Sequence, residues 1–326
     1  MKKNIALVWG GYTSEFVVSE KSMQGIFLFL DKTKYNAYKV KIDRESWSVD
    51  IDGEMCNIDK NDFSFVSSGE KINFDFAYIT IHGAPGEDGC LQAYFDMLEI
   101  PYSSCGMMAS ALTMNKYICN KYLRNFEINT AESLLFKEGD TYKIDEIAEK
   151  LKFPMFVKPN LGGSSFATTK VKAVDYLQAA IDSAFEEAKE VIIESFIQGR
   201  EVTCGCYRVG EEISALPLTE VVTANDFFDY DAKYNGQVEE ITPAQIDDEQ
   251  FYLIQDLTKK IYDLIGAKGI IRADYIIQDN IPFLLEVNTV PGMTPTSFIP
   301  QQIKAAGLNI TEFFSEIVDN ELRKKH

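Results

Sequence analysis

Residues 4–9, NIALVW, form a short apolar run that ends at two consecutive glycines. A helical pattern follows over residues 14–30, and a second apolar run, residues 74–81, leads directly to His82. Such alternation of buried strands and helices predicts a parallel α/β arrangement for this part of the chain. Ligands bind beyond the carboxyl ends of strands in open parallel sheets, so we expect both glycine-bearing turns to contribute to a site.

The rest of the chain continues to alternate helical and extended patterns, and 326 residues suit about two or three compact lobes. Residues 223–238 are polar, aromatic and irregular, and a long loop inside a compact domain is usually functional. Strands predicted at 270–277 and 282–287 form a hairpin that turns at Asp279-Asn280. The remaining predicted elements are helices at 106–124, 173–188 and 248–265 and strands at 155–158, 166–171, 191–194 and 201–209.

The composition argues against several kinds of partner. Acidic residues outnumber basic ones 50 to 32, and the net charge of -18 would repel nucleic acid and anionic membranes. No apolar run approaches the roughly 20 residues that span a bilayer, so we expect a cytoplasmic protein without a membrane partner. The six cysteines are scattered, and two histidines cannot complete a zinc pattern with them. We expect reduced, mostly buried cysteines, with Cys204 and Cys206 on one face of a strand.

The predicted hairpin carries the strongest chemical signal in the sequence. Residues two apart share one face of a strand, so Arg272 points with Asp274, and Glu286 points with Asn288. Charged groups among apolar neighbours need a partner or a cation to offset their desolvation. Two carboxylates and an amide oxygen are hard ligands that suit Mg²⁺ bridging phosphates. A buried ion pair between Arg272 and one carboxylate is the alternative.

Three shorter motifs could also contact ligands. Residues 156–165, FVKPNLGGSS, place a glycine-containing turn after a strand, where backbone N–H groups can face phosphate oxygens. A plain β-hairpin has the same sequence pattern and is the alternative. The residue order of the P-loop motif is absent. Glu15 lies in the first helical turn after the glycine pair, where it could receive a cationic amine or complement the helix dipole. His82, at the exit of a strand, could contact a ligand or serve the structure.

Six motifs in this order resemble the D-alanine:D-alanine ligases of the ATP-grasp superfamily, and the resemblance covers nearly the whole chain. They are GGxxxExxVS at 10–19, HGxxGEDG at 82–89, KPxxxGSS at 158–165, FxDYxAKY at 227–234, RxD at 272–274 and ExNxxPGM at 286–293, with Ser297 beyond. The resemblance implies an α/β fold with α+β lobes in the three-lobed ATP-grasp architecture. It divides the chain into an N-terminal parallel α/β (pre-ATP-grasp) substrate-binding domain at 1–105, a central ATP-grasp lobe at 106–190, and a C-terminal ATP-grasp lobe at 191–326 with a mobile loop at 223–238.

The resemblance also implies a reaction. ATP would phosphorylate the carboxylate of one D-alanine, and the amine of a second would attack the acyl phosphate to give D-alanyl-D-alanine for peptidoglycan precursor synthesis. This chemistry brings anions together, so cations must neutralise the charge. The resemblance assigns two Mg²⁺ ions, for which Mn²⁺ could substitute, to Asp274, Glu286 and Asn288. It assigns contacts with ATP to Lys116, Lys158, Glu194, Phe196, Ile197, Glu201 and Lys233.

Further assignments from the resemblance concern the first D-alanine. Glu15 would bind its ammonium group, Val18 would pack nearby, and His82 would face its carboxylate. Ser164 and Tyr234 match the residues that link the amino-terminal lobe to the mobile loop.

For the second substrate, the resemblance assigns Arg272 and the N–H of Gly292 to the oxyanion of the tetrahedral intermediate, and Ser297 to the incoming carboxylate. A homodimer is the expected assembly. Relatives that make D-alanyl-D-lactate or D-alanyl-D-serine share most of these motifs, but tyrosine at position 234 favours the dipeptide. A nucleotide-binding protein without catalysis would carry lesions among the metal and substrate residues, and the assigned residues are all present.

Overall fold

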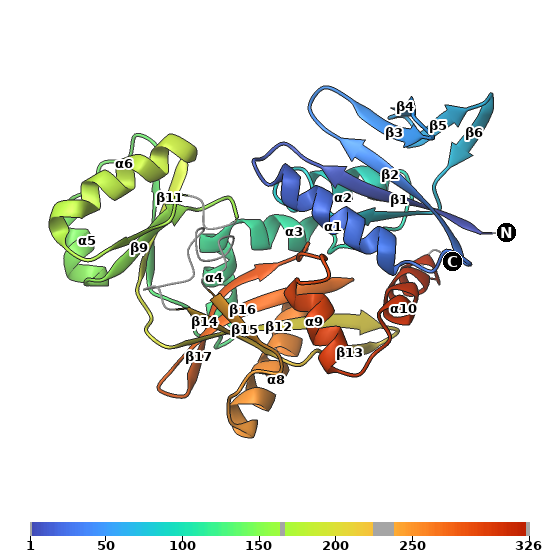
Figure 1. The fold of residues 1–326 in the computed structure, drawn as a ribbon. Helices are drawn as coiled ribbons and strands as arrows, with labels where there is room; N and C mark the ends of the chain where they lie inside the picture. The colour runs from blue at the N-terminus through green and yellow to red at the C-terminus, as the bar shows by residue number, and fades with distance from the viewer. Residues whose placement is uncertain (1, 164–166, 224–237, 324–326) are drawn as a thin grey trace.

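The computed structural model describes residues 2–163, 167–223 and 238–323, and these contain three β-sheets with helices packed against them (Figure 1). The first sheet comes from the amino-terminal part of the chain, and the other two follow in sequence. This arrangement agrees with the predicted α/β fold with α+β lobes. The predicted domain boundaries at residues 105 and 190 stay predictions.

The first sheet combines a parallel centre with an antiparallel arm. Strand β1 (Lys3–Gly10) pairs in parallel with β2 (Tyr35–Ile42) and with β7 (Phe76–Ile79), as the alternating pattern predicts. Beyond β2 the sheet continues as an antiparallel arm that the sequence does not predict, because its short strands expose many polar side chains. The arm consists of β3 (Trp47–Ile51), β4 (Glu54–Asp59), β5 (Ser64–Ser67) and β6 (Glu70–Asn73).

Both faces of β1 are covered, which explains why its sequence is apolar throughout. Alternate residues of a strand point to opposite faces. Ile5 and Leu7 therefore join one hydrophobic cluster with residues of α1 (Phe16–Phe29), whereas Ala6 and Val8 join another on the opposite face. All four side chains are fully buried.

The second sheet has its own helices and its own core. Its order is β10-β9-β11-β8, and all neighbouring strands are antiparallel. The helix predicted at 173–188 begins as a 3₁₀ turn, and the start of the strand predicted at 166–171 lies outside the described residues. The elements are β8 (Ser133–Lys137), α5 (Ile144–Leu151), β9 (Met155–Pro159), β10 (Thr169–Val171), η1 (Val174–Tyr176), α6 (Leu177–Glu187) and β11 (Glu190–Ser195).

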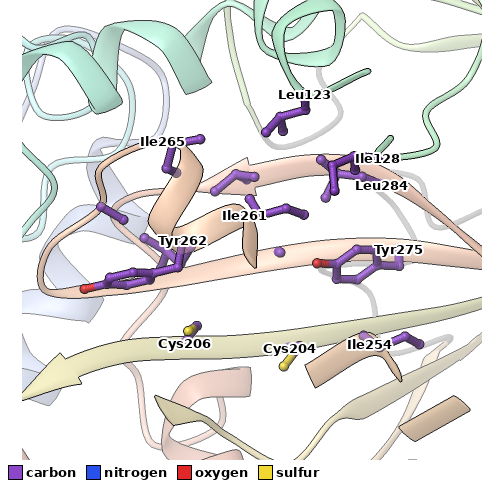
Figure 2. Packing of buried hydrophobic residues seen from close by; sticks show 14 of the residues in the cluster. Leu123, Ile128, Cys204, Cys206, Ile254, Ile261, Tyr262, Ile265, Tyr275 and Leu284 are labelled. Carbon is purple, nitrogen blue, oxygen red and sulfur yellow. The ribbon is translucent and has the colours of Figure 1, made fainter. Parts of the chain in front are cut away.

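The third sheet has the order β15-β14-β12-β16-β17, and β13 pairs with β12 at its side. As predicted, Cys204 and Cys206 share one face of β12, and both are fully buried in the cluster that Figure 2 shows. Residues from α4 (Lys116–Arg124) and α8 (Asp248–Leu264), such as Leu123 and Ile261, pack against this face. The sheet contains β12 (Arg200–Val209), β13 (Glu212–Ala215), β14 (Thr219–Thr223), β15 (Val238–Ile241), β16 (Ile270–Gln278) and β17 (Ile281–Asn288), and α8 spans Asp248–Leu264.

The prediction of one continuous helix from residue 106 to residue 124 is wrong. Two helices, α3 (Met107–Met114) and α4 (Lys116–Arg124), meet at Asn115, whose backbone is extended with φ -89° and ψ 94°. The Asn115 Oδ1 atom accepts a backbone N–H from the first turn of α4 at 3.0 Å and the Nδ2 of Asn160 at 3.0 Å. An asparagine cap satisfies an N–H group that a helix start leaves unpaired, so it favours a new helix at this point.

The hairpin of β16 and β17 turns at Asp279 and Asn280, as predicted. Both residues have positive φ angles, 50° and 62°, which is typical of the tight turns that match the twist of antiparallel strands. Asp274 lies opposite Glu286, and the register then shifts, which leaves Leu285 as an extra residue on β17. Such a bulge redirects neighbouring side chains and is common beside active sites.

A shared core joins the first sheet to the third. Residues of β1 and α1 pack with Ile270 of β16 and with apolar side chains of the last two helices, α9 (Phe298–Ala305) and α10 (Ile310–Arg323). Helix α2 (Cys90–Met97) contributes to the cluster on the other face of the first sheet. No helix in the described ranges is long and apolar enough to cross a bilayer.

Gly25 marks the closest approach between α1 and the chain beyond β17, and it provides a test of this packing. A Cβ atom at this position would lie 2.0 Å from the carbonyl oxygen of Met293. Alanine normally stabilises a helix interior by roughly 1 kcal/mol relative to glycine. We expect Gly25→Ala to destabilise the protein instead, by about 1–3 kcal/mol, because overpacking outweighs the helix preference.

Chemical denaturation of the purified variant measures this change. The matched control is Gly106→Ala, where the nearest atoms to an added Cβ are 4.0 Å away. A more stable Gly25→Ala protein would contradict the close packing of α1 against this loop.

Candidate active site

A cavity of about 1350 Å³ is lined by residues from the first sheet's turn after β1 and from strands of the other two sheets. Most of the residues that the sequence singles out line this one cavity. They come from elements far apart in the chain, and folding brings them together. The predicted site residues in the lining are Glu15, Val18, Lys116, Lys158, Glu194, Phe196, Ile197, Glu201, Arg272, Asp274 and Glu286.

Other predicted residues lie next to the lining or outside the described chain. Asn288 donates from Nδ2 to Asp274 Oδ2 at 3.0 Å, which attaches it to the cavity wall. A Cβ atom on Gly292 would lie 3.0 Å from Ser297 Oγ, so these two residues are close neighbours. His82 is buried behind the wall. Ser164, Lys233 and Tyr234 lie outside the described residues, as does most of the predicted loop at 223–238.

The carboxylate of Asp274 accepts four hydrogen bonds from other site residues. Arg272 donates to it twice, from Nε to Oδ1 at 2.8 Å and from Nη2 to Oδ2 at 2.7 Å. Thr203 Oγ1 on β12 donates to Oδ1 at 2.6 Å, and Asn288 on β17 donates to Oδ2. The ion pair between Arg272 and a carboxylate, which the sequence offered as the alternative to a magnesium site, is therefore present. Thr203 was not predicted, because on a strand it resembles any other β-branched residue.

Arg272 remains positively charged in this setting. Burial disfavours its charged form, but the nearby carboxylates of Asp274 and Glu286 outweigh burial and hold its pKa above the ordinary value. The guanidinium group has five N–H donors, and Asp274 engages two of them. It can therefore bind an anion in the cavity without releasing Asp274.

The donor chemistry of the hairpin fits Mg²⁺. Asp274, Glu286 and Asn288 offer two carboxylates and an amide oxygen on neighbouring strands. No group of three histidine, cysteine, aspartate or glutamate side chains in the described ranges could hold a metal ion. In magnesium sites of the phosphate-bridging kind the protein supplies only one or two carboxylates, because the phosphates supply further oxygens.

Two lysines, Lys116 and Lys158, bring positive charge to the cavity wall. Lys158 Nζ lies 2.6 Å from Glu194 Oε2, and Lys116 Nζ lies 3.7 Å from Glu286 Oε2. Burial disfavours the charged form of Lys158, but Glu194 outweighs it and raises the lysine pKa. Lys116 also donates to the carbonyl oxygen of Gly162, in the glycine turn after β9. The predicted turn thus lies beside two ammonium groups.

Glu15 faces this glycine turn from the first sheet. A Cβ atom on Gly163 would lie 3.1 Å from Glu15 Oε2. Helix α1 begins at Phe16, so Glu15 occupies the cap position and not the first turn. The Glu15 side chain makes no capping hydrogen bond, but its carboxylate stands at the N-terminus of α1, where the helix dipole favours negative charge.

The connection between β11 and β12 closes one end of the cavity. The Phe196 N–H donates to the Pro154 carbonyl oxygen at 3.2 Å. The next residue, Ile197, makes no backbone hydrogen bond to any other described residue. An N–H and a carbonyl at a cavity edge need partners, so this connection can bind the polar edge of a flat ligand.

Glu87 and Ser22 lie next to the site, where they accept backbone N–H groups of the segment after β17, and neither was predicted from the sequence. Glu87 accepts the N–H of Gly83 at 2.8 Å and the N–H of Val290 at 3.3 Å. Removal from water raises the pKa of Glu87 to about 7, the Gly83 N–H opposes this shift, and the negative charge of Glu15 adds to it. Its position inside the HGxxGEDG motif was the one signal that could have identified it.

Comparisons with known proteins cover almost the whole chain. The family model for the D-ala D-ala ligase N-terminus matches residues 4–105, and the model for the D-ala D-ala ligase C-terminus matches residues 122–319. A D-alanine--D-alanine ligase of Parabacteroides distasonis is 58% identical over 327 residues, covering 100% of this chain and 99% of the relative. One of Bacteroides fragilis is 56% identical over 323 residues, covering 98% of this chain and 100% of the relative.

Solved structures give the same answer. D-alanyl-alanine synthetase A from Vibrio cholerae superposes with a TM-score of 0.89 at 28% identity, covering 99% of both chains. The VanG D-Ala:D-Ser ligase from Enterococcus faecalis gives 0.85 at 30% identity over 100% of both chains. The D-alanine--D-alanine ligase from Bacillus anthracis complexed with ATP gives 0.80 at 29% identity, covering 99% of this chain and 98% of that one. With both family models and full-length relatives in agreement, the chain belongs to the D-alanine--D-alanine ligase family.

Proposed function

We propose that the protein joins two D-alanine molecules into D-alanyl-D-alanine with ATP, through an acyl phosphate, and so supplies a precursor for cell-wall synthesis. The observation that supports this most directly is the composition of the cavity. Its lining combines an acidic residue for an ammonium group, lysines beside a glycine turn, and the Arg272–Asp274 pair. Relatives with 52–58% identity over nearly their full lengths carry the name of this ligase.

The first half of the reaction transfers a phosphoryl group to a carboxylate, and it needs positive charge. Lys116 and Lys158 would contact the phosphates, next to the glycine turn. Asp274, Glu286 and Asn288 would hold Mg²⁺, two ions in our proposal, with Mn²⁺ as a substitute. Bound Mg²⁺ supplies charge neutralisation between the reacting anions. Adenine would lie against the β11–β12 connection, beside the backbone of Ile197 and the side chains of Glu194, Phe196 and Glu201. Lys233 would reach the phosphates.

The first D-alanine would bind at the wall formed by the start of α1. Glu15 would attract its ammonium group, and Val18 would limit the size of its side chain. His82 would lie on the carboxylate side. Ser164 and Tyr234 would complete this wall when residues 223–238 cover the site and exclude water, which otherwise hydrolyses an acyl phosphate.

The second half of the reaction creates a tetrahedral oxyanion. Arg272 keeps donors available beyond its two bonds to Asp274, and the Gly292 N–H makes no hydrogen bond to any other described residue. These two groups would stabilise the oxyanion, because donors arranged in advance stabilise developing charge most effectively. Ser297, beside Gly292, would receive the carboxylate of the second D-alanine. We further propose a cytoplasmic homodimer, for which the family resemblance is the support.

The second substrate provides the sharpest test of the proposed function. The fold alone does not choose it, because a D-Ala:D-Ser ligase shares this fold. We expect D-alanine to be the preferred partner at neutral pH, with ADP released in proportion to dipeptide formed. The measurement is ADP release over D-alanine, D-serine and D-lactate, with the products weighed by mass spectrometry and L-alanine as the control. A dominant D-lactate product would overturn the proposal, and ATP binding without turnover on any D-amino acid would indicate a catalytically silent protein.

Arg272→Lys tests the oxyanion role. Lysine keeps the charge but cannot form two parallel hydrogen bonds with Asp274 while it also faces a ligand. We expect kcat to fall by about 10²-fold to 10³-fold, as when one oxyanion donor is removed. Steady-state kinetics measure this loss.

The matched control is Arg208→Lys. Arg208 lies on β12 of the same sheet, outside the cavity lining, and forms an ion pair with Asp263 on α8. The kcat of this control should stay within about twofold of the unsubstituted protein, as expected for an exposed ion pair. Equal turnover by Arg272→Lys would remove the guanidinium group from the proposed mechanism.

A further inference from the structure

The segment of residues 289–293, which we call the Gly292 loop, follows β17 and is anchored in two separate cores. Val290 belongs to the cluster on one face of the first sheet, and Met293 belongs to the cluster on the other face. Both side chains are buried, with 5% and 4% of their surface exposed. The two anchors fix the ends of the loop, and the orientation of the peptide groups between them depends on hydrogen bonds.

Glu87 supplies the first of these bonds. Its Oε1 accepts the Val290 N–H at 3.3 Å, and its Oε2 accepts the Gly83 N–H at 2.8 Å. One carboxylate therefore ties the turn after β7 to a loop 203 residues further along the chain. Each oxygen has its own N–H donor, so a group with a single acceptor oxygen could not replace this carboxylate.

Ser22 on α1 supplies the second bond. Its Oγ accepts the Met293 N–H at 3.3 Å and lies 3.2 Å from His82 Nε2. Ser22 is fully buried, and among the described contacts His82 Nε2 is the one acceptor for its hydroxyl proton. The hydroxyl then donates to Nε2, which places the proton of a neutral His82 ring on Nδ1. Ser22 thus connects the Gly292 loop with the histidine that the family resemblance places near the first substrate.

These contacts leave the Gly292 N–H, which lies between the two bonded N–H groups, for a ligand. Val290 and Met293 donate to Glu87 and Ser22, and Pro291 has no N–H. In the described ranges, the Gly292 N–H makes no hydrogen bond. The side chains of Glu87 and Ser22 thus hold the N–H groups on either side of Gly292. The Gly292 N–H between them can point toward the reacting atoms.

We infer that Glu87 and Ser22 are positioning residues that orient the Gly292 N–H toward the oxyanion and, through Ser22, fix the proton on His82. This inference rests on the proposed ligase function and extends it. Neither side chain is among the described residues that line the cavity, so both act through other groups. The physical reason is that an oxyanion donor contributes most when its orientation is set before the charge develops.

Two substitutions test the inference. Glu87→Gln keeps the shape of the side chain but offers one acceptor oxygen, so it must turn an NH₂ group toward one of the two N–H donors. Ser22→Ala removes the acceptor of the Met293 N–H and the partner of His82. We expect each variant to lower kcat by about 10-fold to 100-fold, less than direct loss of an oxyanion donor, while KM for ATP stays within about twofold. A purely structural role would instead weaken ATP binding in parallel with kcat.

Matched controls and further variants separate the outcomes. Ser315→Ala removes a buried hydroxyl that donates to the Thr311 carbonyl oxygen within α10, and Glu321→Gln alters a buried carboxylate outside the cavity lining. Both should keep the original kcat. Ser22→Cys keeps the size of serine with a weaker donor and acceptor, so its kcat should lie between those of serine and alanine. Because both residues act on one loop, the double variant should lose less than the product of the single losses.

The inference and the proposed function can fail separately. If the unsubstituted protein forms no dipeptide, the proposed function is wrong, whatever the variants do. If it forms dipeptide and both variants keep kcat within about twofold, the positioning role is wrong and the ligase remains. Parallel loss of ATP affinity, or fully multiplicative losses in the double variant, would also overturn the positioning role.

Discussion

The Asp274 carboxylate imposes the constraint on which the site depends, because it is a buried charge that three strands must satisfy together. Thr203 on β12, Arg272 on β16 and Asn288 on β17 all donate to it. An unpaired carboxylate in this position would be costly, so the register of the third sheet and its bulge at Leu285 are tied to the chemistry. The strands that build the core of the sheet thus also fix the orientation of Arg272.

The turns and helix starts next to the strand ends position the other residues of the site. The turn after β1 places Glu15 beside the glycine turn of the second sheet, and Lys116 lies at the start of α4, next to Asn115. The protein carries a net charge of -18, yet its proposed substrates include a nucleotide and carboxylates. Attraction must therefore be local, and Lys116, Lys158 and Arg272 supply it at the wall of the cavity.

Much of this arrangement can be predicted from the sequence, and the exceptions have physical causes. The hairpin turn at Asp279-Asn280 and the shared face of Cys204 and Cys206 follow from local geometry. The break at Asn115 depends on a contact with Asn160, 45 positions away, which no local pattern records. Glu87 and Thr203 have roles only through partners on other elements, so they too escaped detection.

The second sheet differs from the other two in how its core is built. Its hydrophobic cluster and the apolar residues packed on it all come from residues 134–193, whereas one cluster combines residues of the first and third sheets. A unit with a self-contained core can shift as a rigid body, because its own hydrophobic contacts move with it. The second sheet carries Lys158 and the glycine turn. The phosphate-facing wall can therefore open and close as one piece, while the walls that hold the substrates' amine and the oxyanion stay fixed to each other.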